Sequence, residues 1–404
     1  MSNTQKKNVP ELRFPEFEGE WEEKELGDVA SFAKGKLGAK KDVSKTGVPI
    51  ILYGELYTKY GAIVSKIFSK TDIPENKLKM ASKNDVLIPS SGETAIDIAT
   101  ASCVYLNKGV AVGGDINILK PQKQDGRFIS LSINGINKNE LSKYAQGKTV
   151  VHLYNNDIKN LKIAFPSQFD EQQKIGDLFS ELDRQIELEE QKLELLQQQK
   201  KGYMQKIFSQ ELRFKDENGD DYPEWEEKKM GEITTMFSGG TPQSTNTRYY
   251  KGDIPFIRSG EISKTYTEVK INEEALNNSS AKLVEVGDLL YALYGATSGE
   301  VAISKINGAI NQAVLCIRTN ESIEFLLNYL FFSKNKILNT FIQGGQGNLS
   351  ANIIKNLIIE IPTIIEQRKI GDFFCNIDNL IEIQERKLEF LKQRKQSLLQ
   401  KMFV

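Results

Sequence analysis

The sequence EQQKIGDLF at residues 171–179 occurs again, almost unchanged, as EQRKIGDFF at residues 366–374. Other words repeat in the same order: ELRF at 11–14 and 211–214, EWEEKELGD at 20–28 and EWEEKKMGE at 224–232, VPIILYGEL at 48–56 and IPFIRSGEI at 254–262, and IKNLKIAFP at 158–166 and IKNLIIEIP at 354–362. The offset between copies stays between 195 and 206 residues. A collinear repeat of this kind indicates a tandem duplication of one unit of about 200 residues.

The composition is that of a globular protein of two or three domains. The chain has 404 residues, of which 39% are hydrophobic and 26% charged. It has no long apolar run and no apolar signal core, and Cys103, Cys316 and Cys375 form no Cys-x-x-Cys pair. We therefore expect a cytoplasmic protein without a disulfide framework or zinc site. The net charge of −1 gives no overall attraction to nucleic acid or membrane, although a local basic face remains compatible with DNA binding.

Each copy has a first part with short apolar runs such as VPIIL, DVLIP and NILKP, separated by Gly, Asn, Asp and Pro. This pattern predicts a mixed α/β domain of short strands, with a helix before the last strand, as at 324–335. The predicted boundaries are a tail at 1–19, head 1 at 20–167, a first long helix at 168–209, head 2 at 210–363 and a second long helix at 364–404.

The two long helices are predicted from sequence that lacks proline and is rich in Glu, Gln, Lys and Leu. A heptad frame fits both and predicts a coiled-coil seam. The apolar seam positions are Ile175, Phe179, Leu182, Ile186, Leu193, Leu196 and Ile207 in the first helix, and Ile370, Phe374, Ile377, Ile381, Leu388, Leu391, Leu398 and Met402 in the second. Polar residues interrupt both seams at equivalent positions, Glu189 with Gln384 and Lys200 with Lys395. They either fix the register or lie at the seam edge with their charges in water.

Connectivity favours an antiparallel pair of these helices, because the second helix has no other apolar seam to pack against. At roughly 1.5 Å per residue, each helix is about 60 Å long. The predicted fold class is therefore an α/β (α+β) tandem duplication. Two mixed α/β heads are separated by a long antiparallel two-helix coiled coil with a pseudo-twofold axis.

We find no convergent set of catalytic or metal-ligating residues in the sequence. His152 is the single histidine and is interpreted as a surface residue. QGKT at 146–149 lacks the upstream glycine of a phosphate-binding loop. Asp72, Glu75 and Lys77 resemble a nuclease set, but they lie in a proline-containing turn and are not repeated. We therefore predict no catalytic residues, no metal and no cofactor.

Two similar heads on a spacer suit a ligand that is extended and repetitive, and duplex DNA is the commonest such ligand. Lysines, tyrosines and small polar residues mix with glycine in loops at 33–41, 53–60 and 89–97 of head 1, and at 237–250, 258–262 and 294–300 of head 2. For each loop alone, a solvated turn is the alternative. The candidate DNA contacts are Lys34, Lys36, Lys40, Lys41, Tyr53, Tyr57, Lys59, Tyr60, Ser90, Ser91 and Thr94 in head 1, and Ser238, Thr241, Gln243, Arg248, Tyr249, Tyr250, Arg258, Ser259, Tyr294 and Thr297 in head 2.

The chain resembles the specificity subunits of type I restriction–modification systems over nearly its whole length. The resemblance rests on the paired EWEEKELGD and EWEEKKMGE openings, SGGTP at 238–242, IPFIRSGEI, and above all the two helix starts that share Glu-Gln-x-Lys-Ile-Gly. It implies that each head is a target recognition domain that binds one half of a split, asymmetric DNA site, while the helices set the gap. SGGTP has no clean match in head 1, where SFAKGKLG stands at 31–38, so base contacts cannot be transferred between heads.

The resemblance also implies partners. A non-catalytic subunit of this family carries two modification subunits that methylate adenine with S-adenosylmethionine, and these recruit ATP-driven restriction subunits. The charged helix face at 187–201 either docks such partners or is simply solvated. The main alternative function is a coiled-coil scaffold whose heads bind proteins or carbohydrates, and a self-sufficient nuclease or methyltransferase is disfavoured by the missing motifs.

Overall fold

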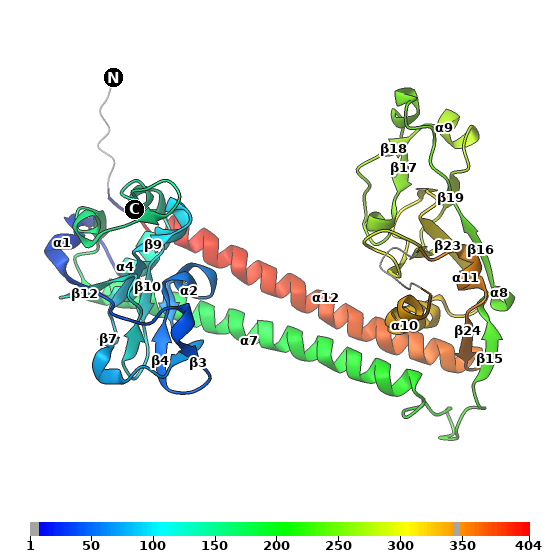
Figure 1. Cartoon of the computed structure of the whole chain (residues 1–404), viewed down its shortest axis with the longest axis horizontal. Coiled ribbons are helices and arrows are strands. Elements are labelled where there is room, and N and C mark those ends of the chain that lie inside the picture. The colour runs from blue at the N-terminus through cyan, green and yellow to red at the C-terminus, as the bar shows by residue number, and fades with distance from the viewer. Residues whose placement is uncertain (1–7, 342–347) are drawn as a thin grey trace. The chain divides into compact units, whose positions relative to one another are not determined.

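The computed structural model describes residues 8–341 and 348–404. Its contacts divide the chain into two compact units: unit 1 comprises Met1–Gln191 and Arg386–Val404, and unit 2 comprises Lys192–Glu385. Two helices, α7 (Phe169–Phe208) and α12 (Ile364–Lys401), contribute to both units (Figure 1). Each unit thus combines one head with the N-terminal part of one long helix and the C-terminal part of the other.

The described part of unit 1 contains two five-stranded sheets. One has the order β2-β12-β8-β10-β5 and the other β3-β6-β4-β11-β7, and the pairs β1-β14 and β13-β9 are separate. The strands are β1 (Glu22–Glu25), β2 (Ala30–Lys34), β3 (Val43–Ser44), β4 (Val48–Ile51), β5 (Ile63–Val64), β6 (Ser69–Thr71), β7 (Lys79–Ala81), β8 (Val86–Pro89), β9 (Ser91–Gly92), β10 (Ser102–Val104), β11 (Val110–Val112), β12 (Ile116–Pro121), β13 (Val151–His152) and β14 (Lys162–Phe165). The short helices are α1 (Leu26–Val29), η1 (Lys40–Asp42), α2 (Tyr53–Thr58), η2 (Glu75–Lys77), α3 (Ala95–Ile98), α4 (Gly126–Asn134), α5 (Lys138–Ser142) and α6 (Asn155–Ile158), where η marks 3-10 helices.

The described part of unit 2 contains two four-stranded sheets, ordered β16-β23-β20-β21 and β18-β17-β22-β19, and the pair β15-β24. The strands are β15 (Glu226–Lys229), β16 (Thr234–Ser238), β17 (Ile254–Ile257), β18 (Lys270–Ile271), β19 (Lys282–Val284), β20 (Leu289–Ala292), β21 (Val301–Ile303), β22 (Gly308–Ile310), β23 (Val314–Thr319) and β24 (Ile358–Ile361). The helices are α8 (Met230–Ile233), η3 (Thr247–Tyr250), η4 (Ser259–Glu261), α9 (Glu273–Asn277), α10 (Ile323–Phe341) and α11 (Ala351–Lys355).

The two heads share one topology. The order β2-β12-β8-β10 of unit 1 recurs as β16-β23-β20-β21 in unit 2, and β6-β4-β11-β7 recurs as β18-β17-β22-β19. Even the pairing sense is repeated, because β4 and β11 are parallel, as are β17 and β22, within otherwise largely antiparallel sheets. The predicted duplication of a mixed α/β domain is confirmed.

The repeated segment at the start of each copy contacts the repeated segment at the start of the long helix in the same unit. In unit 1, Arg13 of ELRF donates to both carboxylate oxygens of Glu171, at 2.7 and 2.8 Å. In unit 2, Arg213 donates to both oxygens of Glu366, at 3.2 and 2.8 Å. The glutamates are 1% and 0% exposed, so the arginine neutralises a carboxylate that the fold removes from water.

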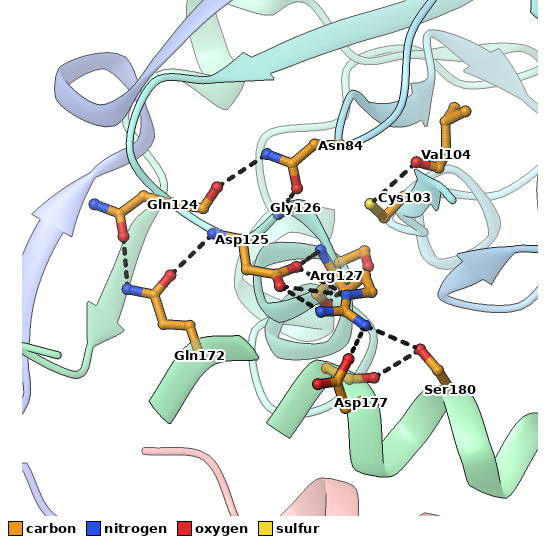
Figure 2. Close-up of polar contacts among 12 residues, drawn as sticks. Asn84, Cys103, Val104, Gln124, Asp125, Gly126, Arg127, Gln172, Asp177 and Ser180 are labelled. Carbon is orange, nitrogen blue, oxygen red and sulfur yellow. Dashed lines mark hydrogen bonds and ion pairs between the residues drawn. The ribbon is translucent and has the colours of Figure 1, made fainter. Parts of the chain in front are cut away.

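The glutamine after each glutamate binds the N-terminus of a head helix. The side-chain oxygen of Gln172 accepts a hydrogen bond from the amide of Asp125, the N-cap of α4 (Figure 2). In unit 2, the side-chain oxygen of Gln367 accepts from the amide of Ser322, immediately before α10. The same side chain therefore holds an equivalent helix against the long helix in both units.

The tryptophans of the repeated openings pack against the cores of the heads, Trp21 buried and Trp225 half-buried. Trp21 is 3% exposed, and its ring lies 5.4 Å from Phe128 of α4 and 6.3 Å from Phe403, which follows α12. In unit 2, Trp225 lies 5.8 Å from Phe325 of α10. Trp21 therefore packs the start of head 1 against the residues that follow α12.

Candidate nucleic-acid interface

The predicted seam residues of the long helices are all buried or half-buried, from Ile175 to Ile207 in α7 and from Ile370 to Met402 in α12. Within unit 1, Asp183 pairs with Lys395 and Glu190 with Lys392, so residue numbers rise along α7 while they fall along α12. The helix segments in this unit are therefore antiparallel.

The lysines that interrupt the seam are ion-paired across it. Lys395 forms a salt bridge with Asp183 in unit 1, and Nζ of Lys200 lies 2.6 Å from Oδ1 of Asp378 in unit 2. The repeat offset of 195 carries Asp183 onto Asp378 and Lys200 onto Lys395, so the two bonds are equivalents of one another. The lysine side chains are only 20% and 19% exposed. Since each charge has a fixed partner on the other helix, the register of packing is specified by these pairs.

Each unit also exposes large apolar residues of the long helices. Among them are Leu188 and Phe390 in unit 1, which are 53% and 62% exposed, and Leu195 and Ile383 in unit 2, which are 58% and 59% exposed. All four occupy the same heptad position. In an antiparallel pair, such positions on the two helices flank the same side of the seam. Each of these pairs is a candidate contact for a partner protein.

The loop at 33–41 carries four free cations of head 1. Lys34, Lys36, Lys40 and Lys41 are all exposed, and among the described residues none of their ammonium groups has a carboxylate partner. Lys40 and Lys41 lie in η1, so they are held by a short helix rather than by an irregular loop. Four uncompensated positive charges over so short a stretch favour contact with phosphates.

The segment at 53–60, expected to be a loop, is mostly the helix α2. Glu55 causes this difference, because its carboxylate accepts from the amide of Leu52 and caps the helix. Tyr53 is exposed and Tyr57 half-buried, whereas the charge of Lys59 is paired with Glu55 at 2.8 Å. Tyr60 accepts from the amide of Phe68, and burial raises the pKa of Tyr60 to about 12.

The segment at 89–97 divides between core and surface. Ser90 is 3% exposed, so its hydroxyl is withdrawn from solvent. Ser91 is half-buried in β9, and its hydroxyl lies 3.0 Å from Nδ1 of His152. Thr94 is exposed and caps α3, accepting from the amide of Asp97. His152, interpreted from the sequence as a surface residue, is half-buried and contacts this candidate loop.

In head 2, the candidate residues at 237–250 lie around the end of β16 and η3. Gln243 and Arg248 are exposed, whereas Ser238 and Tyr249 are half-buried. Thr241 is exposed and its hydroxyl donates to the side chain of Gln312. The hydroxyl of Tyr250 donates to the carbonyl of Pro242 at 2.6 Å, which fixes this half-buried ring.

Arg258 is already engaged by two carboxylates. It donates to both oxygens of Glu261, at 3.0 and 3.1 Å, and to Glu268 at 2.6 Å. These hydrogen bonds raise the pKa of Arg258. Glu261 also caps η4 through the amide of Arg258, as Glu55 caps α2 in head 1, which explains why the glutamate is repeated. Ser259, Tyr294 and Thr297 are half-buried.

A buried arginine of unit 1, Arg127, has a structural role. Arg127 donates to both oxygens of Asp125, to Asp177 at 2.5 Å and to the hydroxyl of Ser180 at 3.4 Å (Figure 2). Burial alone would lower the pKa of Arg127, but the hydrogen bonds to the two aspartates outweigh it and the pKa is raised. Because the guanidinium is 5% exposed and joins α4 to α7, it anchors the head to the helix.

Comparison with known proteins assigns the class. The model of the type I restriction modification DNA specificity domain matches residues 18–198 and 222–393. The chain therefore belongs to this family of DNA specificity proteins and carries its domain twice. Within the described residues, no helix is long and apolar enough to cross a membrane.

Similar proteins extend over the whole chain. The MjaVIII type I restriction enzyme specificity subunit of Methanocaldococcus jannaschii is 25% identical over 418 residues, covering 97% of this chain and 93% of that protein. The putative MjaX specificity subunit of the same organism is 24% identical over 97% of this chain and 95% of that protein. The crystal structure of the type I restriction–modification S subunit from M. genitalium has the same fold, with a TM-score of 0.66 at 18% identity, covering 98% of this chain and 99% of that one.

Proposed function

We propose that this chain is the DNA-binding specificity subunit of a type I restriction–modification complex, and that each head reads one half of a split, asymmetric site. The observation that carries the proposal is a duplicated framework with unlike surface loops. The heads share strand order, pairing sense and buried contacts, yet their loops at 33–41 and 237–250 differ in sequence and length. Two different half-sites require different contact residues, which an equal framework can hold in the same way in each head.

The contacts expected at each half-site differ in kind. The free lysines of loop 33–41 suit phosphates, which position a protein on the duplex without reading its sequence. Tyr53, Gln243 and Arg248 are exposed side chains of the type that reach base edges. Since the whole chain has a net charge of −1, its own phosphate neutralisation is limited and partner subunits are needed for tight binding.

The partners in this proposal are two modification subunits that transfer a methyl group from S-adenosylmethionine to adenine, and ATP-dependent restriction subunits that join them. The exposed apolar pairs Leu188 with Phe390 and Leu195 with Ile383 are the proposed docking residues on the helices. Replacement of Leu195 and Ile383 by glutamate should abolish co-purification of one modification subunit while the isolated chain remains folded. The cytoplasm is the proposed compartment, which agrees with free thiols at Cys103, Cys316 and Cys375.

The long helices are proposed to set the length of the unread gap. Inserting a few residues into both helices between the units should change the spacing of the methylated site and leave both half-sequences intact. A change in either half-sequence would contradict this role.

The experiment that tests the function is an exchange of head 2 for that of a relative, followed by sequencing of methylated DNA from cells that express the complex. We expect one half-site to change and the other to persist. If both half-sites remained unchanged, or if the complex showed no salt-dependent affinity for DNA, the chain would instead act as a scaffold whose heads bind other ligands.

A further inference from the structure

In both heads, an equivalent backbone hydrogen bond lies a few residues before the repeated IKNL segment. In head 1, the amide of Leu153 donates to the carbonyl of Ser90 at 3.1 Å. In head 2, the amide of Leu349 donates to the carbonyl of Leu293 at 3.0 Å. Leu153 and Leu349 are 0% and 2% exposed, so both junctions are fixed to the core.

The side chains next to this shared bond differ between the heads. On the donor side, His152 precedes Leu153, and Asn348 precedes Leu349. On the acceptor side, Ser91 follows Ser90, and Tyr294 follows Leu293. The same backbone hydrogen bond is therefore flanked by Ser91 and His152 in head 1 and by Tyr294 and Asn348 in head 2.

In head 1 the imidazole is held in one orientation. His152 lies opposite Ser91 in the β13–β9 ladder, and Nδ1 is 3.0 Å from the serine hydroxyl. The ring also stacks on Tyr154, with centroids 6.1 Å apart and planes inclined by 23°. Within the described residues, Nε2 has no hydrogen-bond partner, so the ring presents one polar atom of fixed direction.

The surroundings of this ring are exposed and partly aromatic. Val150 and Tyr154 are 52% and 47% exposed. A ring carbon of Tyr57 lies 3.8 Å from the position that a β-carbon on Gly92 would occupy, which places the tyrosine of α2 beside the Ser91 loop. A fixed polar atom bordered by exposed apolar surface is suited to the edge of a base and its neighbouring methyl or ring.

We propose that His152 is a specificity-determining residue of head 1, which contacts a base edge through Nε2 and is positioned by Ser91, and that Asn348 has the equivalent role in head 2. This inference rests on the proposed DNA-reading function. The two side chains have different recognition chemistry: an imidazole offers a single polar atom, as for a purine N7, whereas an asparagine amide offers a donor and an acceptor together, as for adenine N6 and N7. The heads would thus differ in the base they prefer at this point.

The test uses the complete complex of this chain with its proposed modification subunits. His152→Ala is compared with Asn348→Ala as the matched variant of head 2, and with Asn107→Ala as an exposed control in head 1. Two measurements are made: the sequence of methylated sites in cells, and binding to duplexes in which each base pair of either half-site is changed singly.

We expect His152→Ala to reduce discrimination at one base pair of the head 1 half-site by roughly five- to tenfold, and to leave the other half-site unchanged. Asn348→Ala should have the converse effect, and Ser91→Ala should weaken discrimination at the same base pair as His152→Ala. Asn107→Ala should change neither half-site.

The outcomes separate the two proposals. If the unaltered complex recognises no bipartite site, the proposed function fails. If it does recognise one and His152→Ala retains full discrimination at every base pair, or weakens all duplexes equally, the inference about His152 is overturned. Should His152→Ala not fold, Ser91→Ala and His152→Asn decide the matter by the same criterion.

Discussion

Replacement of Arg213 by methionine should destabilise unit 2 by about 2–3 kcal/mol. Glu366 is 0% exposed, and Arg213 supplies two hydrogen bonds to it, at 3.2 and 2.8 Å. Removal of one partner of a buried ion pair typically costs about 3–5 kcal/mol. Glu366 also lies in the first turn of α12, where the helix dipole favours an anion by up to about 2 kcal/mol, so part of the charge remains compensated.

Urea denaturation followed by fluorescence measures this change, because each unit contains one tryptophan. A Trp21→Phe background leaves Trp225 as the single tryptophan, which reports on unit 2. Lys228→Met is the matched control, since it removes an exposed pair with Glu226 and should cost less than about 0.5 kcal/mol.

The double replacement Arg213→Met with Glu366→Met should recover most of the lost stability, because no buried charge then remains unpaired. Our explanation of the repeated ELRF and EQ segments would be refuted if Arg213→Met destabilised unit 2 no more than Lys228→Met does. It would also be refuted if the double variant were less stable than Arg213→Met alone.

Three further predictions concern stability. Trp21→Ala should destabilise unit 1 by about 3–5 kcal/mol and leave the recognised half-sites unchanged, which denaturation and methylated-site sequencing together would check. Gly202→Ala should stabilise unit 2 by about 0.5–1 kcal/mol, since a β-carbon there meets nothing within 4 Å, whereas Gly371→Ala should destabilise it because its β-carbon would lie 2.8 Å from a head side chain; urea midpoints for the two variants should move in opposite directions. Burial would raise the pKa of Glu261, but the hydrogen bonds from Arg258 and from backbone amides lower it below its ordinary value of about 4.3; this stabilisation is therefore present above that value and lost as the pH falls, and Glu261→Gln should flatten the acid side of a stability–pH curve.

The sequence was sufficient to predict the fold class because the duplication repeats the residues that make buried contacts. Trp21, Arg13 and Glu171 recur in the second copy, and the structure shows that each of them is fixed by another repeated residue. Heptad spacing likewise predicted helices at 168–209 and 364–404, and the structure has them at Phe169–Phe208 and Ile364–Lys401.

The surface was harder to predict, because short-range capping and pairing decide which polar groups are free. Glu55 and Glu261 convert expected loops into short helices, and Glu261 also engages the charge of Arg258. The contact of His152 with Ser91 joins residues 61 positions apart and leaves no local signal. The position of His152 just before the repeated IKNL block, where the copies diverge, was the available clue.

The equivalent bonds Asp183–Lys395 and Lys200–Asp378 have an evolutionary consequence. Each copy carries both charges of the pair: Asp183 and Lys200 in the first copy, and Asp378 and Lys395 in the second. The helix surface of one copy is therefore complementary to an identical surface, as in twofold dimers. A single ancestral copy could therefore have paired with its twin before the gene was duplicated. In the present chain, an exchange of one head for a foreign one would leave these ion pairs intact. Under the proposed function, such an exchange would give the protein a new DNA specificity.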